Sequence, residues 1–247
     1  MENKQAHAGN ENYDENFYRE LQRVANSAAN VLKVVSKFIR PRSVVDLGCG
    51  VGSWLEYWQK NFGAEVHGID GDYVDKKWLC IAERNFHPFN LEERINLNRR
   101  FDLAMTIEVA EHLTPARADS FIEDLTKLSD VILFSAAIPA QGGVNHINEQ
   151  WQSYWAEKFL RLGYVAVDCI RPTVWDVNYR VEDSHRQNIF IYVKSTELYR
   201  YPELHDFYLK HRDTTIYDLV HPITFFVQVN EFNRFRQEVQ NHLANQR

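Results

Sequence analysis

Short apolar runs alternate with helical patterns along most of this 247-residue chain. A run that is apolar at nearly every position, such as Val131 to Ile138, is typical of a strand in a parallel sheet that is covered on both faces. Between such runs, apolar residues recur every three or four positions, as they do from Tyr13 to Ile39, and this spacing predicts helices. The alternation predicts an α/β fold with a doubly wound, mostly parallel sheet of seven strands and extra helices at both ends of the chain.

The last two expected strands have no clear helical pattern between them, so we expect them to pair antiparallel. The third expected strand is a short run around Leu79, which follows the second strand closely. The expected strands are Val44 to Asp46, Glu65 to Asp70, Trp78 to Ala82, Phe101 to Val109, Val131 to Ile138, Tyr164 to Ile170 and Asn188 to Val193.

The same pattern divides the chain into three parts. Residues 1–41 are expected to form a polar tail and a capping helix, residues 42–194 a ligand-binding core, and residues 195–247 a helical appendage. In the appendage, apolar residues step by three or four positions from Phe225 to Leu243 and predict an amphipathic helix. We expect this helix to pack on the sheet or to pair with a second copy of the chain as a homodimer.

Composition excludes several classes of protein. The formal net charge of −6 disfavours a nucleic-acid partner, which usually requires a basic excess. No apolar run approaches the roughly 20 residues of a membrane span, and no secretory leader is present, so we expect no membrane partner. The 3 cysteines are scattered and odd in number, which predicts reduced thiols and a cytoplasmic protein.

The most informative motif is the turn after the first expected strand, where Gly48, Gly50 and Gly52 follow Asp46 at alternate positions. Such a turn brings backbone N–H groups and a helix N-terminus against a ligand. A dinucleotide fingerprint would place a third glycine where Ser53 stands, and an acid before the glycines suits a ligand that carries an amino group. A tight turn without ligand and a nicotinamide-dependent reductase remain the alternatives.

This motif resembles that of the class I methyltransferases that use S-adenosylmethionine (SAM), which have a Rossmann-like fold. Asp70 ends the second expected strand, where a carboxylate can accept hydrogen bonds from both hydroxyls of a ribose. Tyr73 could pack on the adenosine, and Asn90 stands where many such enzymes carry the acid that binds adenine. The cofactor-binding residues that the resemblance implies are Asp46, Gly48, Cys49, Gly50, Gly52, Trp54, Asp70, Gly71, Tyr73, Asn90, Leu91 and Glu108.

The candidate chemistry follows the fourth and fifth expected strands. Glu108, Glu111 and His112 lie within one turn, and His146 follows the glycines at 142 and 143. Carboxylate and imidazole ligands suit Mg²⁺ or Mn²⁺, so these four residues form a candidate metal site. Alternatively, His112 or His146 acts as a general base without metal, with Glu111 beside it. A purely positional or structural role for these residues is the third interpretation. The candidate catalytic residues are therefore His112, His146 and Glu111.

The Glu-x-x-Glu-His pattern is similar to that of two methyltransferase groups, which act on the 2′-hydroxyl of small-RNA ends and in ubiquinone synthesis. The segment from Leu133 to Trp151 also resembles a bacterial methyltransferase family that often lies among genes for surface polysaccharides and secondary metabolites. These resemblances imply SAM-dependent O-methylation of a small hydroxylated acceptor, sugar- or nucleotide-linked. An RNA 3′-end 2′-O-methyltransferase and a non-catalytic SAM-binding scaffold are the alternatives.

A long connection between the last two expected strands, Arg171 to Gln187, carries aromatic residues and arginines. Aromatic rings stack on sugars and arginines bind phosphate, so we expect a lid over the acceptor. An ordinary surface loop is the alternative.

Overall fold

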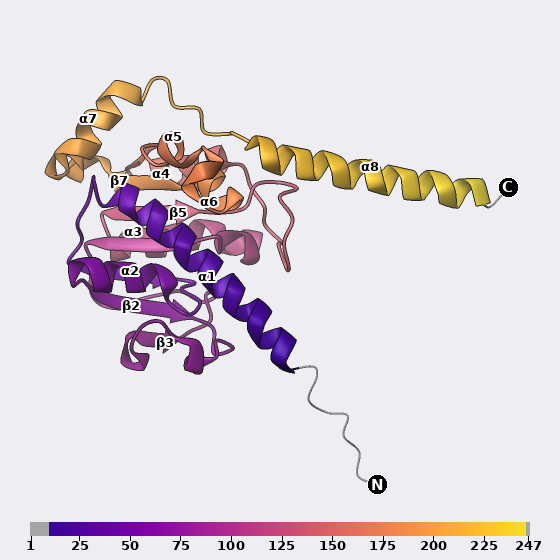
Figure 1. Cartoon of the computed structure of the whole chain (residues 1–247). Coiled ribbons are helices and arrows are strands. Elements are labelled where there is room, and N and C mark those ends of the chain that lie inside the picture. The colour runs from indigo at the N-terminus through magenta and orange to yellow at the C-terminus, as the bar shows by residue number, and fades with distance from the viewer. Residues whose placement is uncertain (1–9, 246–247) are drawn as a thin grey trace, which may run out of the picture.

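The computed structural model describes residues 10–245, with side chains over 22–242, and shows a central sheet covered by helices on both faces (Figure 1). The 7 strands lie in the order β3-β2-β1-β4-β5-β7-β6. All neighbouring pairs are parallel except those of β7, which runs antiparallel to β5 and β6. The expected Rossmann-like fold and the antiparallel closing pair are therefore confirmed. The strands are β1 Ser43–Leu47, β2 Glu65–Asp70, β3 Phe86–Pro88, β4 Leu103–Ile107, β5 Val131–Ser135, β6 Tyr164–Val167 and β7 Phe190–Lys194.

Helices connect the strands and extend both ends of the described chain. The α-helices are α1 Asn10–Val35, α2 Ser53–Phe62, α3 Ala118–Leu128, α4 Gln152–Arg161, α5 Arg171–Val174, α6 Asp183–Asn188, α7 Pro202–His211 and α8 Pro222–Asn245. The 3₁₀ turns are η1 Lys76–Trp78, η2 Glu83–Asn85, η3 Ala110–His112, η4 Pro115–Arg117, η5 Val177–Tyr179 and η6 Ser195–Arg200.

Two apolar cores lie on opposite faces of the sheet, and successive strand residues contribute to them alternately. Val44 belongs to the core beneath α1 and α2, whereas Val45 belongs to the core beneath α3 and α4. On β5, Leu133 and Phe134 divide in the same way. Because both faces are buried, the central strands β4 and β5 are almost wholly apolar, which explains why the sequence shows them as continuous apolar runs.

The expectation of a strand at Trp78 to Ala82 is wrong. This segment lies between the turns η1 and η2, and the third strand of the sheet is β3, a few residues later. The backbone N–H of Cys80 donates to the carbonyl of Val51 at 2.8 Å. The segment therefore pairs with the glycine turn instead of extending the sheet.

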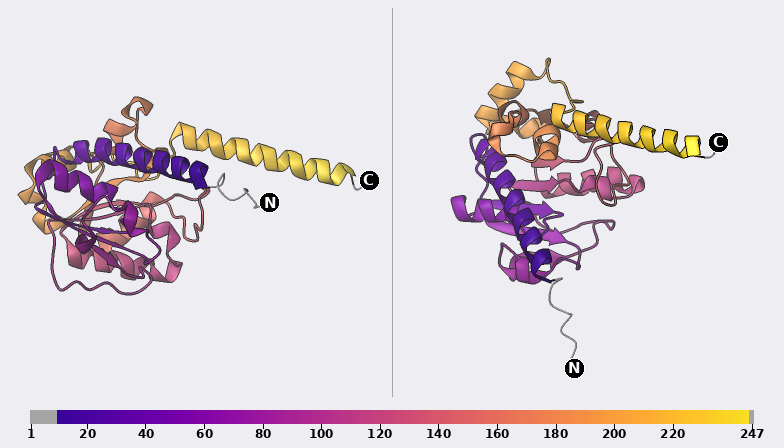
Figure 2. Two further views of the ribbon diagram at one scale, coloured as in Figure 1. Left: turned by 60° about the horizontal axis from the view of Figure 1, so that its bottom comes forward. Right: turned by 45° about the vertical axis from the view of Figure 1, so that its right-hand side comes forward.

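The C-terminal helix α8 extends away from the sheet, as Figures 1 and 2 show. Thr224 is buried at its base, but Phe232 and Phe235 are 64% and 63% exposed. Packing of the whole helix on the sheet is therefore wrong, because its outer part contacts none of the strands. Pairing with a second copy stays a prediction, as does the division of the chain at residues 41 and 194. Along residues 10–245, no helix has the length and apolar character needed to cross a membrane.

Candidate active site

A cavity of about 950 Å³ opens at the carboxyl ends of β1, β2 and β4. In an open α/β sheet, this edge is where ligands bind. The residues that line it come from the glycine turn, the ends of β2 and β3, the segment after β4 and the loop between β5 and α4. They are Gly48, Gly50, Asp70, Gly71, Asp72, Tyr73, Pro88, Phe89, Asn90, Leu91, Glu92, Glu108, Val109, His112, Leu113 and Asn145.

The glycine turn requires glycine for two separate reasons at position 48. Gly48 has a φ of 82°, in the left-handed region, which favours glycine. A Cβ atom there would also lie 2.3 Å from Cγ2 of Val109, so the turn packs directly on the segment after β4. This close packing lets the backbone form one wall of the cavity.

Asp70 joins the glycine turn to the end of β2. Its Oδ2 accepts a hydrogen bond from the backbone N–H of Gly50 at 2.7 Å. Its Oδ1 accepts from the N–H of Gly71 at 2.7 Å and from the hydroxyl of Tyr73 at 2.6 Å. Partial burial of the hydroxyl group, and then its bond to Asp70, raise the pKa of Tyr73 to about 12, so the phenol stays a donor at neutral pH. The Tyr73 ring lies over Gly71, with the residue 80% exposed.

Asp46 is a buried acid with an unused acceptor. The residue is 2% exposed and its Oδ1 has no hydrogen-bond partner among the described residues. Burial, and then the nearby charge of Asp70, raise the pKa of Asp46 to about 7. A cationic group placed beside a buried carboxyl with a raised pKa stabilises its ionised form.

Some of the expected cofactor residues lie behind the cavity and do not line it. Cys49 lies against Gly68 of β2, and Gly52 lies against Ile81. Trp54 is buried with its ring edge-on to His185 at 5.2 Å between centroids. Asp46, Cys49, Gly52 and Trp54 are thus absent from the cavity lining, whereas Gly48, Gly50, Asp70, Gly71, Tyr73, Asn90, Leu91 and Glu108 belong to it.

Glu108 sits in an amide cradle that the sequence did not reveal. Its backbone has a φ of 54°, a strained conformation for a residue with a side chain. Its carboxylate accepts hydrogen bonds from the Gln141 amide at 2.9 Å and from the Asn188 amide at 3.3 Å. Burial raises the pKa of Glu108, and these donors oppose the rise. Gln187 extends the network by donating to Gln141 at 3.3 Å.

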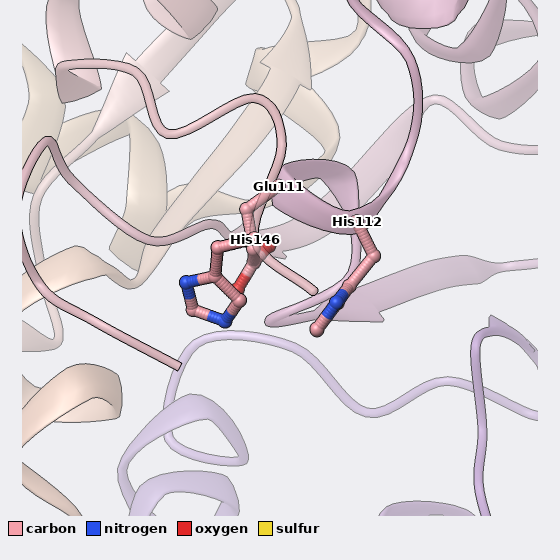
Figure 3. Close-up of side chains that lie close together, drawn as sticks. All are labelled: Glu111, His112 and His146. Carbon is pink, nitrogen blue, oxygen red and sulfur yellow. The ribbon is translucent and has the colours of Figure 1, made fainter. Parts of the chain in front are cut away.

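Glu111, His112 and His146 come together at the end of β4, and Figure 3 shows their side chains facing one another. One donor atom from each lies within 4.8 Å of the others. Glu111 is 0% exposed, and neither of its carboxylate oxygens has a hydrogen-bond partner of normal geometry within the described part of the chain. Burial, and then the charge of Glu108, raise the pKa of Glu111 to about 9. Glu108 is not part of this three-residue group.

Both imidazoles of the group use Nδ1 and leave Nε2 available. Nδ1 of His112 donates to the carbonyl of Asn145 at 3.3 Å, and Nδ1 of His146 donates to Glu149 at 2.9 Å. Burial, and then His146, lower the pKa of His112, so this ring is neutral at neutral pH. A neutral ring that donates from Nδ1 carries a lone pair on Nε2, which can bind a metal or accept a proton.

The connection was expected to bind phosphate through its arginines, but the two arginines near its ends are buried and bond to the protein itself. Arg171 is buried and donates to Asp168 and to the carbonyls of Ile216 and Tyr217. Arg186 is also buried and donates to backbone carbonyls of its own connection. Arg171 therefore ties the connection to the segment before α8, and Arg186 holds the connection itself in place.

A family model described as a methyltransferase domain matches residues 14–165, more than half of the chain. The chain belongs to this family. It is 34% identical over 84 residues to the ubiquinone biosynthesis O-methyltransferase of Rhodopseudomonas palustris, which is 30% of this chain and 31% of that protein. It is 31% identical over 96 residues to the tocopherol O-methyltransferase of Arabidopsis thaliana, covering 36% of this chain and 27% of that one. The chain thus matches about a third of the length of these curated relatives.

Solved structures agree with this assignment at the level of the fold. An O-methyltransferase family protein from Burkholderia thailandensis matches with a TM-score of 0.54 at 15% identity, over 74% of this chain and 58% of that one. The sugar N-methyltransferase KedS8 from Streptoalloteichus matches with a TM-score of 0.54 at 13% identity, over 78% and 97%. The resemblance to class I SAM-dependent methyltransferases is therefore confirmed.

Proposed function

We propose that this methyltransferase transfers the methyl group of SAM to a hydroxyl of a small, uncharged, sugar-like acceptor, and that a divalent cation assists the transfer. The named O-methyltransferases among its relatives support oxygen as the acceptor atom. The observation that carries the metal is the unpartnered carboxylate of Glu111 beside the two open imidazole nitrogens.

The cavity fits SAM on two observations. Asp46, which lies behind the glycine turn and not in the cavity lining, is a buried acid with a free oxygen, and an amine of the cofactor that reached it would give it a cationic partner. Asp70 is held between two backbone N–H groups, which fixes its carboxylate for the ribose. When bound, the cofactor supplies a methyl group on a sulfonium centre.

Glu111, His112 and His146 fit Mg²⁺ or Mn²⁺ because they offer one carboxylate and two imidazoles. A cation there supplies Lewis acidity that favours ionisation of an acceptor hydroxyl. Glu108 stays with its amide donors in this proposal, so it orients the wall of the cavity and does not bind the ion. The open Nε2 of His112 is the alternative acceptor for the hydroxyl proton.

The charge of the cavity supports an uncharged acceptor over RNA or a nucleotide-linked sugar. Asp70, Asp72, Glu92 and Glu108 line the cavity, and none of its described lining residues is Lys or Arg. A phosphate-bearing acceptor would meet carboxylates without a cationic side chain to bind it.

The proposal is tested by methyl transfer from radiolabelled SAM to a panel of catechols, free sugars, nucleotide sugars and RNA oligonucleotides. We expect label on an uncharged hydroxyl compound, at least tenfold faster with Mn²⁺ than with EDTA. His146→Ala should lose the response to Mn²⁺, while His87→Ala, on β3 outside the cavity lining, should keep it. Transfer to RNA alone, or equal rates in EDTA, would contradict the acceptor and the metal respectively. Binding of cofactor without transfer to any class would favour the scaffold.

Tyr73→Phe is expected to bind S-adenosylhomocysteine about threefold to tenfold more tightly than the natural protein does. The Tyr73 hydroxyl occupies Oδ1 of Asp70, where a ribose hydroxyl would have to bind. Removing the hydroxyl removes this competition, worth about 1 kcal/mol, and keeps the ring for packing on the adenosine. Isothermal titration calorimetry measures the change. Weaker binding by Tyr73→Phe would show instead that the hydroxyl contributes to the bound state.

A further inference from the structure

The loop between β5 and α4 is organised around one carboxylate that neither the proposed chemistry nor the cofactor uses. Oε2 of Glu149 accepts the backbone N–H of Ala140 at 2.7 Å. Its Oε1 accepts the N–H of Gly142 at 3.1 Å and Nδ1 of His146 at 2.9 Å. Three donors thus converge on one side chain that is 19% exposed, and one of the donors is a proposed active-site imidazole.

The rest of the loop leaves the His146 ring little freedom. A Cβ atom on Gly143 would lie 2.3 Å from Nε2 of His146, so the ring packs directly over this glycine. Past the ring, the N–H groups of Ile147 and Asn148 both donate to the backbone carbonyl of Glu111 at 2.9 Å. The loop is therefore tied to the residue whose carboxylate faces His146.

We propose that Glu149 is a positioning residue that holds His146 in the tautomer protonated at Nδ1, with the Nε2 lone pair turned toward Glu111 and His112. This inference rests on the proposed role of His146. An ionised carboxylate only accepts hydrogen bonds, so the shared proton belongs to Nδ1 and the lone pair to Nε2. The carboxylate also closes the turn from Ala140 to Gly142, which fixes the place of the ring as well as its tautomer.

No neutral side chain of the same size can replace this arrangement. A glutamine at position 149 has one acceptor oxygen, and whichever way its amide points, its NH₂ group faces a donor of the loop or Nδ1 of His146. If the NH₂ group faces Nδ1, the ring is protonated at Nε2 and loses the lone pair on that nitrogen. Partners that orient a metal-binding histidine typically change metal affinity by about 10–100-fold when they are removed.

The test measures directly which nitrogen of the His146 imidazole carries the proton. Histidine is labelled with ¹⁵N, and the nitrogen signals of His146, assigned by their loss in His146→Ala, are recorded in EDTA with S-adenosylhomocysteine bound. In the natural protein we expect the tautomer protonated at Nδ1. Glu149→Gln is expected to raise the population protonated at Nε2 and to weaken Mn²⁺ binding at least tenfold, with S-adenosylhomocysteine affinity unchanged within about twofold. Glu149→Asp, which keeps a carboxylate, should recover part of the Mn²⁺ affinity.

Glu157→Gln is the matched control, because Glu157 lies on α4 in an exposed pair with Arg161 and is expected to change neither readout. A natural protein with His146 protonated at Nε2 would overturn the inference without any variant. So would a folded Glu149→Gln with the natural tautomer and Mn²⁺ affinity. If the natural protein binds no Mn²⁺, the metal part of the proposed function fails, while the tautomer measurement still decides the role of Glu149.

Discussion

Asp70→Ala is expected to weaken binding of S-adenosylhomocysteine by at least about 100-fold. The Asp70 carboxylate lines the cavity and holds the N–H groups of Gly50 and Gly71, and two ribose hydroxyls would take the free position on Oδ2 and the Oδ1 position that the Tyr73 hydroxyl occupies. Each hydrogen bond to a charged group contributes about 1.5–3 kcal/mol. Loss of the two ribose bonds alone therefore corresponds to about 3–6 kcal/mol, and a factor of 100 is about 2.7 kcal/mol. Calorimetric titration of the purified variant measures the loss.

Asp72→Ala is the matched control for this prediction. Asp72 also lines the cavity, two residues further along, but it is exposed. We expect its removal to change the affinity by no more than about threefold, because an exposed charge is screened by water. Natural affinity in a folded Asp70→Ala protein would mean that the ribose does not bind at the end of β2.

The parts of the fold that the sequence predicted are those determined by local pattern. Continuous apolar runs such as Val131 to Ile138 had to be buried on both faces, and the glycines after Asp46 required a turn at the edge of the sheet. Reliance on local pattern also explains the wrong prediction of a strand for the run at Trp78 to Ala82. Its apolar residues suit a strand, but the bond from Cys80 to Val51 takes this segment to the glycine turn. Nothing local to that run indicates this contact.

The sequence predicted which residues form the candidate site, but it did not predict the hydrogen-bond partners that surround them. Spacing brought Glu111 and His112 together, and the order of the strands brought His146 beside them. The cradle of Glu108 could not be predicted, because Asn188 comes from the end of α6, 80 positions away in the chain. The role of Glu149 depends on a turn whose hydrogen bonds form only when the loop is folded.

The burial of Glu111 leads to the second large effect, which is on stability. Glu111→Gln is expected to raise the melting temperature of the metal-free protein by about 8–16 °C at pH 7.5. The pKa of Glu111 is raised from its ordinary 4.5 to about 9 in the folded chain. A carboxyl group of this kind stabilises the fold fully below pH 4.5, and the contribution is lost as the pH rises toward 9. At pH 7.5 the loss is about 4 kcal/mol, and glutamine does not undergo it.

The pH dependence distinguishes this cause from a general improvement in packing. The difference in melting temperature between Glu111→Gln and the natural protein should be small at pH 5 and grow toward pH 8, measured by calorimetry in EDTA. Glu123→Gln, in an exposed pair with Arg94, should show no such growth. A destabilised Glu111→Gln, or a difference that does not depend on pH, would contradict the assignment.

The same substitution should remove the rise in melting temperature that Mn²⁺ gives the natural protein. A cation offsets the unfavourable burial of the Glu111 charge, so binding and destabilisation have one origin in this carboxylate. A neutral isostere that stabilises the metal-free chain and abolishes the response to Mn²⁺ would show that the acid opposes folding and contributes to binding the ion. If stability rises and the response to Mn²⁺ persists, the ion is held by other residues.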